Sequence, residues 1–138
     1  MANALYGKGR QKYLEGDAKT DWDTASIACY LQDTTAYTVS IDVDEFRTAI
    51  GTPTSTSSNL GSKTTTLGVA DAADLAPAFS AVGTGEGAQQ MVIIAESGTA
   101  ASAPLIVYID TATGLPVTPN GGDINVTWDS GANRIFKL

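Results

Sequence analysis

The segment "PLIVYIDTATGLP", residues 104–116, contains the pattern in this chain that comes nearest to a catalytic motif. Asp110-Thr111 follows an apolar run, as the Asp-Thr-Gly loop of an aspartic protease does. In that loop the glycine lets two carboxylates approach each other and share a proton. Here Gly114 comes two residues too late, and a chain with one such loop would need a second copy to complete the pair. We therefore expect Asp110 to end a strand and to form hydrogen bonds within a turn.

Other side chains suited to catalysis are few. The chain has no histidine, which is the commonest general base, so a Ser-His or Cys-His pair is excluded. Cys29 is the only cysteine, which excludes an intrachain disulfide and a thiolate metal cluster. It lies in the apolar run "TASIACYLQ", and we expect a buried, unreactive thiol there.

Acidic residues gather at Asp42, Asp44 and Glu45, and again at Asp71 and Asp74. Neither spacing matches a calcium-binding loop, so a solvated acidic surface is the simpler interpretation. The glycine-rich segments "GTGEG" and "PNGGD" lack the lysine and the strand-to-helix context of a phosphate-binding loop, and they predict turns. The sequence therefore predicts no metal, no cofactor and no enzymatic activity.

The charge balance bears on the class of partner. The formal net charge is -7, and lysine and arginine together number eight in 138 residues. Nucleic acids and anionic membrane surfaces are bound chiefly through lysine and arginine, so we expect neither as a partner. Apolar runs fall short of the roughly 20 residues of a membrane-spanning helix, and the N-terminus lacks the pattern of a signal peptide. We expect synthesis in a cytoplasm.

Residues 1–23, "MANALYGKGRQKYLEGDAKTDWD", differ in composition from the rest. They hold half of the cationic side chains, and we interpret them as an N-terminal arm or short helix laid against another surface. Asn3 would cap this helix and Gly16 would end it. The apolar side of the helix would be formed by Leu5, Tyr6, Tyr13 and Leu14.

Residues 24–138 have the pattern of a β domain. Short runs rich in β-branched and aromatic residues alternate with turn-forming segments, and the runs at 89–97 and 104–110 are apolar enough for burial on both faces. Asp44 would cap one helical turn that ends at Gly51, and residues 51–62 would form a long exposed loop. The expected strands are "TASIACYLQ", "AYTVSI", "KTTTLGVADAAD", "PAFSAVG", "QQMVIIAES", "PLIVYID" and a final hairpin of "DINVTWD" with "RIFKL".

These segments predict an all-β fold. We expect an antiparallel β-sandwich or jelly-roll-like domain over residues 24–138, preceded by an N-terminal arm or short helix over residues 1–23. An aromatic sugar platform is a weaker interpretation, because most of the large aromatic residues alternate within expected strands and would pack in a core. These aromatic residues are Trp22, Tyr30, Tyr37, Tyr108 and Trp128.

Three stretches resemble a known class of proteins. They are "MANALYGKGRQKYLEGDAKTDW", "YLQDTTAYTVSIDVDEF" and "PLIVYIDTATGLPVTPNGGDINVTWDSGANRIFKL". All three are similar to segments of small virion structural proteins of tailed bacteriophages, most of all capsid decoration (cement) proteins. The resemblance covers a little over half of the chain, and the middle, roughly residues 51–87, has no matching motif.

The resemblance implies a role on the outside of a capsid. Such a protein would bind across major capsid subunits, would form a homo-oligomer, in particular a trimer, and would be localised to the virion after synthesis in the host cytoplasm. The N-terminal arm would contact the shell. The candidate contact residues are Leu5, Tyr6, Lys8, Arg10, Lys12, Tyr13 and Leu14.

Two alternatives stay open at this point. A tail or head-tail structural protein of a phage would show a similar sequence. A surface adhesin or glycan-binding module would instead expose aromatic side chains around a groove. A hydrolase with paired carboxylates is the least favoured, since it requires Asp110 and a second carboxylate to converge in a pocket.

Overall fold

The computed structural model describes residues 3–138, so the first two residues of the expected arm lie outside the described range. Residues 3–138 form ten β-strands, one α-helix and three short 3-10 helices. The strands are β1 (Ala4–Leu5), β2 (Ser26–Gln32), β3 (Ser55–Thr56), β4 (Thr64–Thr66), β5 (Val69–Asp71), β6 (Leu75–Phe79), β7 (Gln90–Glu96), β8 (Leu105–Ile109), β9 (Ile124–Val126) and β10 (Phe136–Lys137). The helices are α1 (Gly7–Glu15), η1 (Ala18–Thr20), η2 (Arg47–Ile50) and η3 (Ala100–Ser102).

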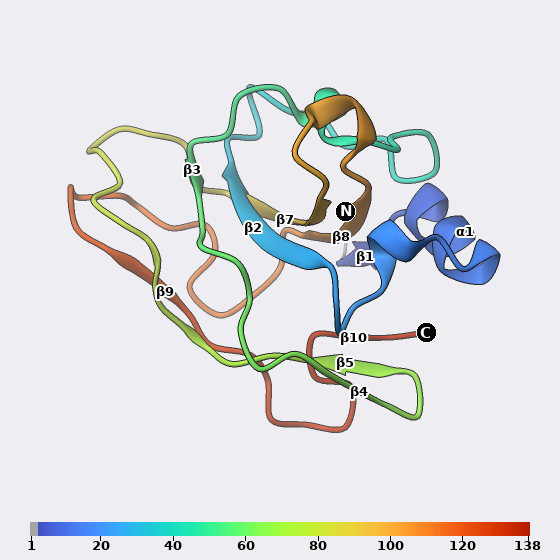
Figure 1. The fold of residues 1–138 in the computed structure, drawn as a ribbon. Coiled ribbons are helices and arrows are strands. Elements are labelled where there is room, and N and C mark those ends of the chain that lie inside the picture. Colours follow the sequence, from blue (N-terminus) through green and yellow to red (C-terminus); the bar gives the residue numbers. More distant parts are fainter. Residues whose placement is uncertain (1–2) are drawn as a thin grey trace.

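The strands form three antiparallel sheets, with β4, β5 and β10 at the bottom of the view in Figure 1. The largest sheet has the order β1-β8-β7-β2-β3, a second has the order β10-β5-β4, and β6 pairs with β9. Every pairing among them is antiparallel. The expectation of a mostly β fold with an N-terminal helix is confirmed at this level.

Strands β2, β7 and β8 form the middle of the largest sheet and are buried on both faces. The apolar runs at 89–97 and 104–110 predicted this burial for β7 and β8, where it is confirmed; no such prediction was made for β2. The register between β2 and β7 runs from Ser26 opposite Glu96 to Gln32 opposite Gln90. Because successive side chains of a strand point to opposite faces, these three strands supply two separate cores.

The first core lies between the five-stranded sheet and the two smaller sheets, and the second lies on the opposite face, under residues 36–50 and the segment that joins β1 to α1. The first core includes Ile27, Cys29, Leu31, Ala70, Leu75, Phe79, Met91, Ile93 and Phe136. The second core includes Tyr6, Ala28, Tyr30, Tyr37, Ile50, Val92, Ile94, Leu105 and Tyr108.

Two expectations for residues 36–50 are wrong. Residues 36–41 form no strand; they cross the second core as a loop, and the Gln90 amide donates a hydrogen bond to the Tyr37 carbonyl at 2.8 Å. Asp44 does not cap the helical turn, because its carboxylate accepts from the Ser40 N–H at 2.8 Å, and η2 begins after Phe46. The turn does end at Gly51, as expected, where φ is +62°.

Two further expectations about the strands are wrong. The segment "KTTTLGVADAAD" is a hairpin of β4 and β5, because Leu67 and Gly68 have φ values of +52° and +80° and reverse the chain. The final segments form no hairpin with each other, since β9 pairs with β6 and β10 pairs with β5. Alternation of apolar residues marks a strand but does not identify its partner, which explains the error.

The N-terminal helix is confirmed, with one correction. Gly16 ends α1 in the left-handed conformation at φ +69°. Asn3 is not its cap, since β1 separates it from the helix. Its side-chain oxygen instead accepts from the N–H groups of Asp110 and Thr111, and its amide donates to the Thr111 carbonyl. Asn3 thereby fixes the start of β1 to the end of β8.

Candidate functional site

Helix α1 is built into the domain, at the side of the largest sheet (Figure 1). Strand β1 adds to the edge of that sheet with Leu5 opposite Val107. The Gly7 N–H then donates to the Ile41 carbonyl at 2.8 Å. A Cβ atom at Gly9 would lie 2.5 Å from the Leu105 carbonyl oxygen, so α1 rests directly on the β8 backbone. Any residue other than glycine at this position would push the helix away from β8.

Four of the seven candidate contact residues are used inside the molecule. Tyr6 is 0% exposed and lies in the second core. Leu5 and Tyr13 are half-buried against the first core. The Lys12 ammonium lies 3.0 Å from the Glu45 carboxylate and 4.9 Å from the centre of the Phe46 ring. These four side chains attach the N-terminal segment to its own domain.

Tyr6 and its partners form a buried hydrogen-bonded group. The Tyr6 hydroxyl lies 2.8 Å from the Tyr37 hydroxyl, which donates to the Asp44 carboxylate at 2.7 Å. Burial raises the pKa of both tyrosines well above the usual value. Both phenols therefore stay neutral at every pH at which the protein is handled, and they act as structural hydrogen-bonding groups.

Of the other three candidates, Arg10 and Leu14 face outward, and Lys8 is half-buried. Leu14 is 90% exposed. Arg10 is exposed beside it on the helix, and its guanidinium lies 3.7 Å from Asp42. Asp42 precedes Val43, which is 71% exposed. Together Arg10, Leu14 and Val43 define a small apolar and cationic surface, hereafter the α1 patch.

Asp110 follows the last residue of β8, as expected for a residue that ends a strand. It is half-buried, its N–H donates to Asn3, and its carboxylate accepts from the Thr111 hydroxyl at 2.9 Å. These contacts are those of a turn residue. Other carboxylates lie in ion pairs or turns of their own, such as Asp71 with Arg134 at 3.1 Å.

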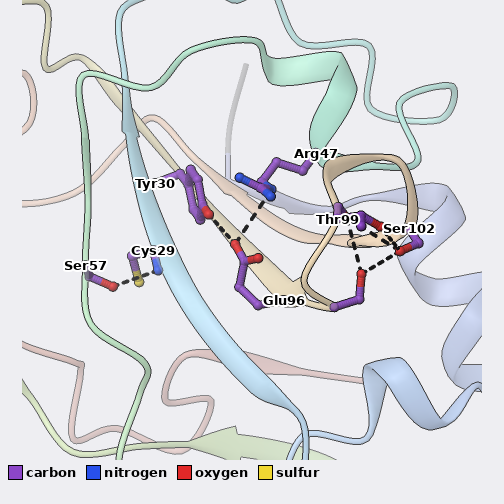
Figure 2. Close-up of polar contacts among 8 residues, drawn as sticks. Cys29, Tyr30, Arg47, Ser57, Glu96, Thr99 and Ser102 are labelled. Atoms are coloured by element: carbon purple, nitrogen blue, oxygen red, sulfur yellow. Dashed lines mark hydrogen bonds and ion pairs between the residues drawn. The ribbon is translucent and has the colours of Figure 1, made fainter.

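A polar cluster that the sequence patterns did not predict lies at the end of β7 (Figure 2). The Tyr30 hydroxyl donates to the Glu96 carboxylate, which also lies 3.8 Å from the Arg47 Nε. Burial, with a smaller effect from Glu96, raises the pKa of Tyr30 to about 12. Nearby, the Ser102 hydroxyl lies 2.6 Å from that of Thr99. The Arg47–Glu96 ion pair joins η2 to β7, although the Arg47 Nε itself has no hydrogen-bond partner among residues 3–138, and the bond between the Ser97 and Ser102 hydroxyls holds η3 to the end of β7.

The Cys29 thiol is fully buried in the first core, which confirms the expectation of a buried thiol. Its backbone N–H donates to the Ser57 hydroxyl at 2.9 Å, as Figure 2 shows. Burial raises the pKa of the thiol from its ordinary value of 9.0 to about 12. The thiolate, which is the reactive form, is therefore scarce in the folded protein at neutral pH.

We expect Cys29 to be inert to thiol reagents at pH 8 in the native protein and to react once urea unfolds the chain. Because the pKa is higher in the folded state, the folded thiol keeps its proton while the unfolded one loses it. Stability should therefore fall as pH rises from about 9 to about 12. Urea titrations of the wild type and Cys29→Ala at several pH values measure this. If the free energy of unfolding falls equally with pH in both proteins, the prediction is contradicted.

A cleft of about 620 Å³ opens between the largest sheet and β9. Its inner wall includes the core residues Leu31, Phe79 and Met91, and its outer part includes Trp128 and Asp129. The Trp128 indole donates to the Ala73 carbonyl at 3.1 Å, so its N–H is already used. The volume lies within the range of roughly 300–1,000 Å³ that is typical of ligand sites. Sequence patterns gave no sign of this cleft, because its wall comes from segments far apart in the chain.

The large aromatic side chains provide no exposed platform. Trp22, Tyr30, Tyr37 and Tyr108 are buried, and Trp128 is half-buried in the cleft wall. Within residues 3–138, no group of three or more acidic or cysteine side chains is placed to hold a metal ion. None of the helices in that range is long and apolar enough to span a membrane. No protein-family model matches the chain, and no curated protein matches its sequence.

Proposed function

We propose that this protein is a non-enzymatic capsid decoration, or cement, protein of a tailed bacteriophage, which binds across major capsid subunits through the α1 patch. The observation that carries the proposal is Leu14, which is 90% exposed on a helix whose other large apolar residue, Tyr13, is half-buried against the first core. An isolated exposed leucine needs no explanation, but Leu14 lies on the segment whose sequence most resembles phage virion proteins. An outward apolar residue with a cation beside it suits attachment to a shell.

The proposal extends to the arrangement of the sheets. We infer that the five-stranded sheet and the two smaller sheets form a jelly-roll-like β-sandwich, with the first core packed between its layers. The second core then attaches α1 to the outside of the sandwich. In this arrangement the helix is a rigid part of the domain, and binding to a shell costs little ordering entropy.

Stabilisation of the shell follows from linkage. A protein that binds only assembled subunits lowers the free energy of the shell by about 2.7 kcal/mol per site when its concentration is a hundredfold above Kd. Many copies act on one shell, so each contact needs only modest affinity. Oligomerisation of the decoration protein strengthens attachment further, since the second and later contacts of one oligomer become intramolecular.

The test is binding to empty shells of the phage that encodes the protein, prepared without it. We expect Leu14→Gln to bind about tenfold to a hundredfold more weakly per contact, because burial of a leucine contributes roughly 1.5–3 kcal/mol. Leu14→Met has a side chain of similar length and stays apolar, so it should bind like the wild type. Co-sedimentation with shells measures both.

Two results would count against the proposal. If Leu14→Gln and Leu14→Met bind shells equally well, the α1 patch is not the contact. If the wild type binds purified tails or connectors but not shells, the protein belongs to the tail or head-tail structure. Point substitutions are preferable to removal of residues 1–16, because Tyr6 belongs to the second core.

A further inference from the structure

The turn between β4 and β5 combines two unfavourable features at one residue. Leu67 has a φ of +52°, a left-handed conformation that is costly for a leucine. It is also 91% exposed. Two-residue turns with positive φ at both positions favour Asn-Gly or Asp-Gly. Residues that depart from the local preferences of a fold tend to occur where the residue has a function outside the fold.

A second exposed apolar residue lies beside this turn. The Leu138 N–H donates to the Gly68 carbonyl at 2.9 Å, and Leu138 is 56% exposed. Lys137, which is exposed, lies opposite Val69 in the adjacent strand pair. The tip of the hairpin is therefore an apolar projection, formed by Leu67 and Leu138, with a cation next to it. We call it the hairpin tip.

The cleft beside β9 has the complementary properties. It is a mainly apolar space whose inner wall reaches core residues such as Met91, and the exposed carboxylate of Asp129 lies at its rim. Arg134 also lines the cleft, but its guanidinium is paired with Asp71. Within the described chain neither Asp129 nor Lys137 has an ion pair. The tip offers an apolar side chain and a free cation, and the cleft offers an apolar space and a free anion.

We propose that the hairpin tip of one copy inserts into the cleft of a second copy, with Leu67 in the apolar space and Lys137 near Asp129. Because the tip and the cleft are different surfaces, the contact is heterologous, and successive contacts close into a ring or extend as a chain. The inference deepens the proposed function, in which subunits cluster on a shell. It concerns the contact between copies, so it is tested without any shell.

Two single variants test the two surfaces of the contact separately, one in the hairpin tip and one in the cleft. Leu67→Asn removes the apolar side chain and places a residue that tolerates positive φ in the turn. We expect it to raise the midpoint of thermal unfolding by a few degrees while abolishing self-association. Thr127→Arg places a long cation at an exposed position on the cleft wall and should block insertion with the fold unchanged. Sedimentation velocity measures the mass of each variant.

The decisive measurement is an equimolar mixture of the two variants. Each should be monomeric alone, yet the mixture should form a one-to-one complex, because Thr127→Arg supplies an intact tip and Leu67→Asn supplies an open cleft. A wild type that stays monomeric up to about 1 mM overturns the proposal. So does a Leu67→Asn protein that associates like the wild type, or a mixture that stays monomeric. Loss of shell binding in Leu14→Gln with this association intact separates the two ideas.

Discussion

Replacement of Tyr6 by alanine is expected to destabilise the protein by about 3–5 kcal/mol, the range found when a large aromatic side chain is removed from a core. Tyr6 is 0% exposed, and its hydroxyl is bonded to that of Tyr37. The loss is a large part of the roughly 5–15 kcal/mol that stabilises a typical domain. Urea unfolding followed by circular dichroism measures it.

Tyr6→Phe and Leu14→Ala serve as controls for that result. Tyr6→Phe keeps the ring and removes one hydrogen bond, so it should cost about 1 kcal/mol. Leu14→Ala alters an exposed position on the same segment and should change stability by less than about 0.5 kcal/mol. If Tyr6→Ala were as stable as the wild type while failing to bind shells, Tyr6 would belong to a free arm and the docked position of β1 and α1 would be wrong.

Gly9→Ala is expected to destabilise the protein by about 1–3 kcal/mol through crowding. A Cβ atom there would meet the Leu105 carbonyl oxygen at 2.5 Å, and that atom belongs to the backbone of a central strand. The sign is informative, because alanine in place of glycine inside an exposed helix stabilises it by about 1 kcal/mol. A stabilised Gly9→Ala protein would show that α1 does not rest on β8.

Gly61→Ala provides the matched control for Gly9. A Cβ atom at Gly61 meets nothing within 4 Å, and its φ is not in the left-handed region. We expect a change between zero and a stabilisation of about 1 kcal/mol, because alanine reduces the conformational freedom of the unfolded chain. Denaturant titration of both variants under one set of conditions separates the contact at Gly9 from the general effect of removing a glycine.

The sequence predicted those elements whose burial is visible in local composition. Strands β7 and β8 are apolar at nearly every position, and Gly16 ends α1 as expected. Residues 36–41 have a similar strand-like composition, yet they form a loop, because their side chains fill the second core from outside the sheet. The composition of a segment indicates that it is buried, but it does not show whether the segment is a strand of the sheet or a loop packed over the sheet.

The candidate site was predictable only in part. The helix and its cationic residues follow from the sequence, but the inward position of Tyr6 and Lys12 depends on contacts with Tyr37 and Glu45, which lie about 30 residues away. The cleft and the hairpin tip were missed for different reasons. The cleft is formed by distant segments, while the Leu67-Gly68 turn is marked in the sequence only by its glycine, and the residues around it predict one strand.

The pairing of β2 with β7 has a consequence for the order in which the chain folds. Residues 26–32 pair early only with the short strand β3, and their full-length pairing with β7 waits until residues 90–96 have been made; β1 likewise waits for β8 near the C-terminus. Among residues 3–138, the pairs that join consecutive strands are β2 with β3, β4 with β5, and β7 with β8. Non-local pairing of this kind is slow, in the range of milliseconds to seconds. The α1 patch therefore reaches its final position late in folding, after translation has passed β8.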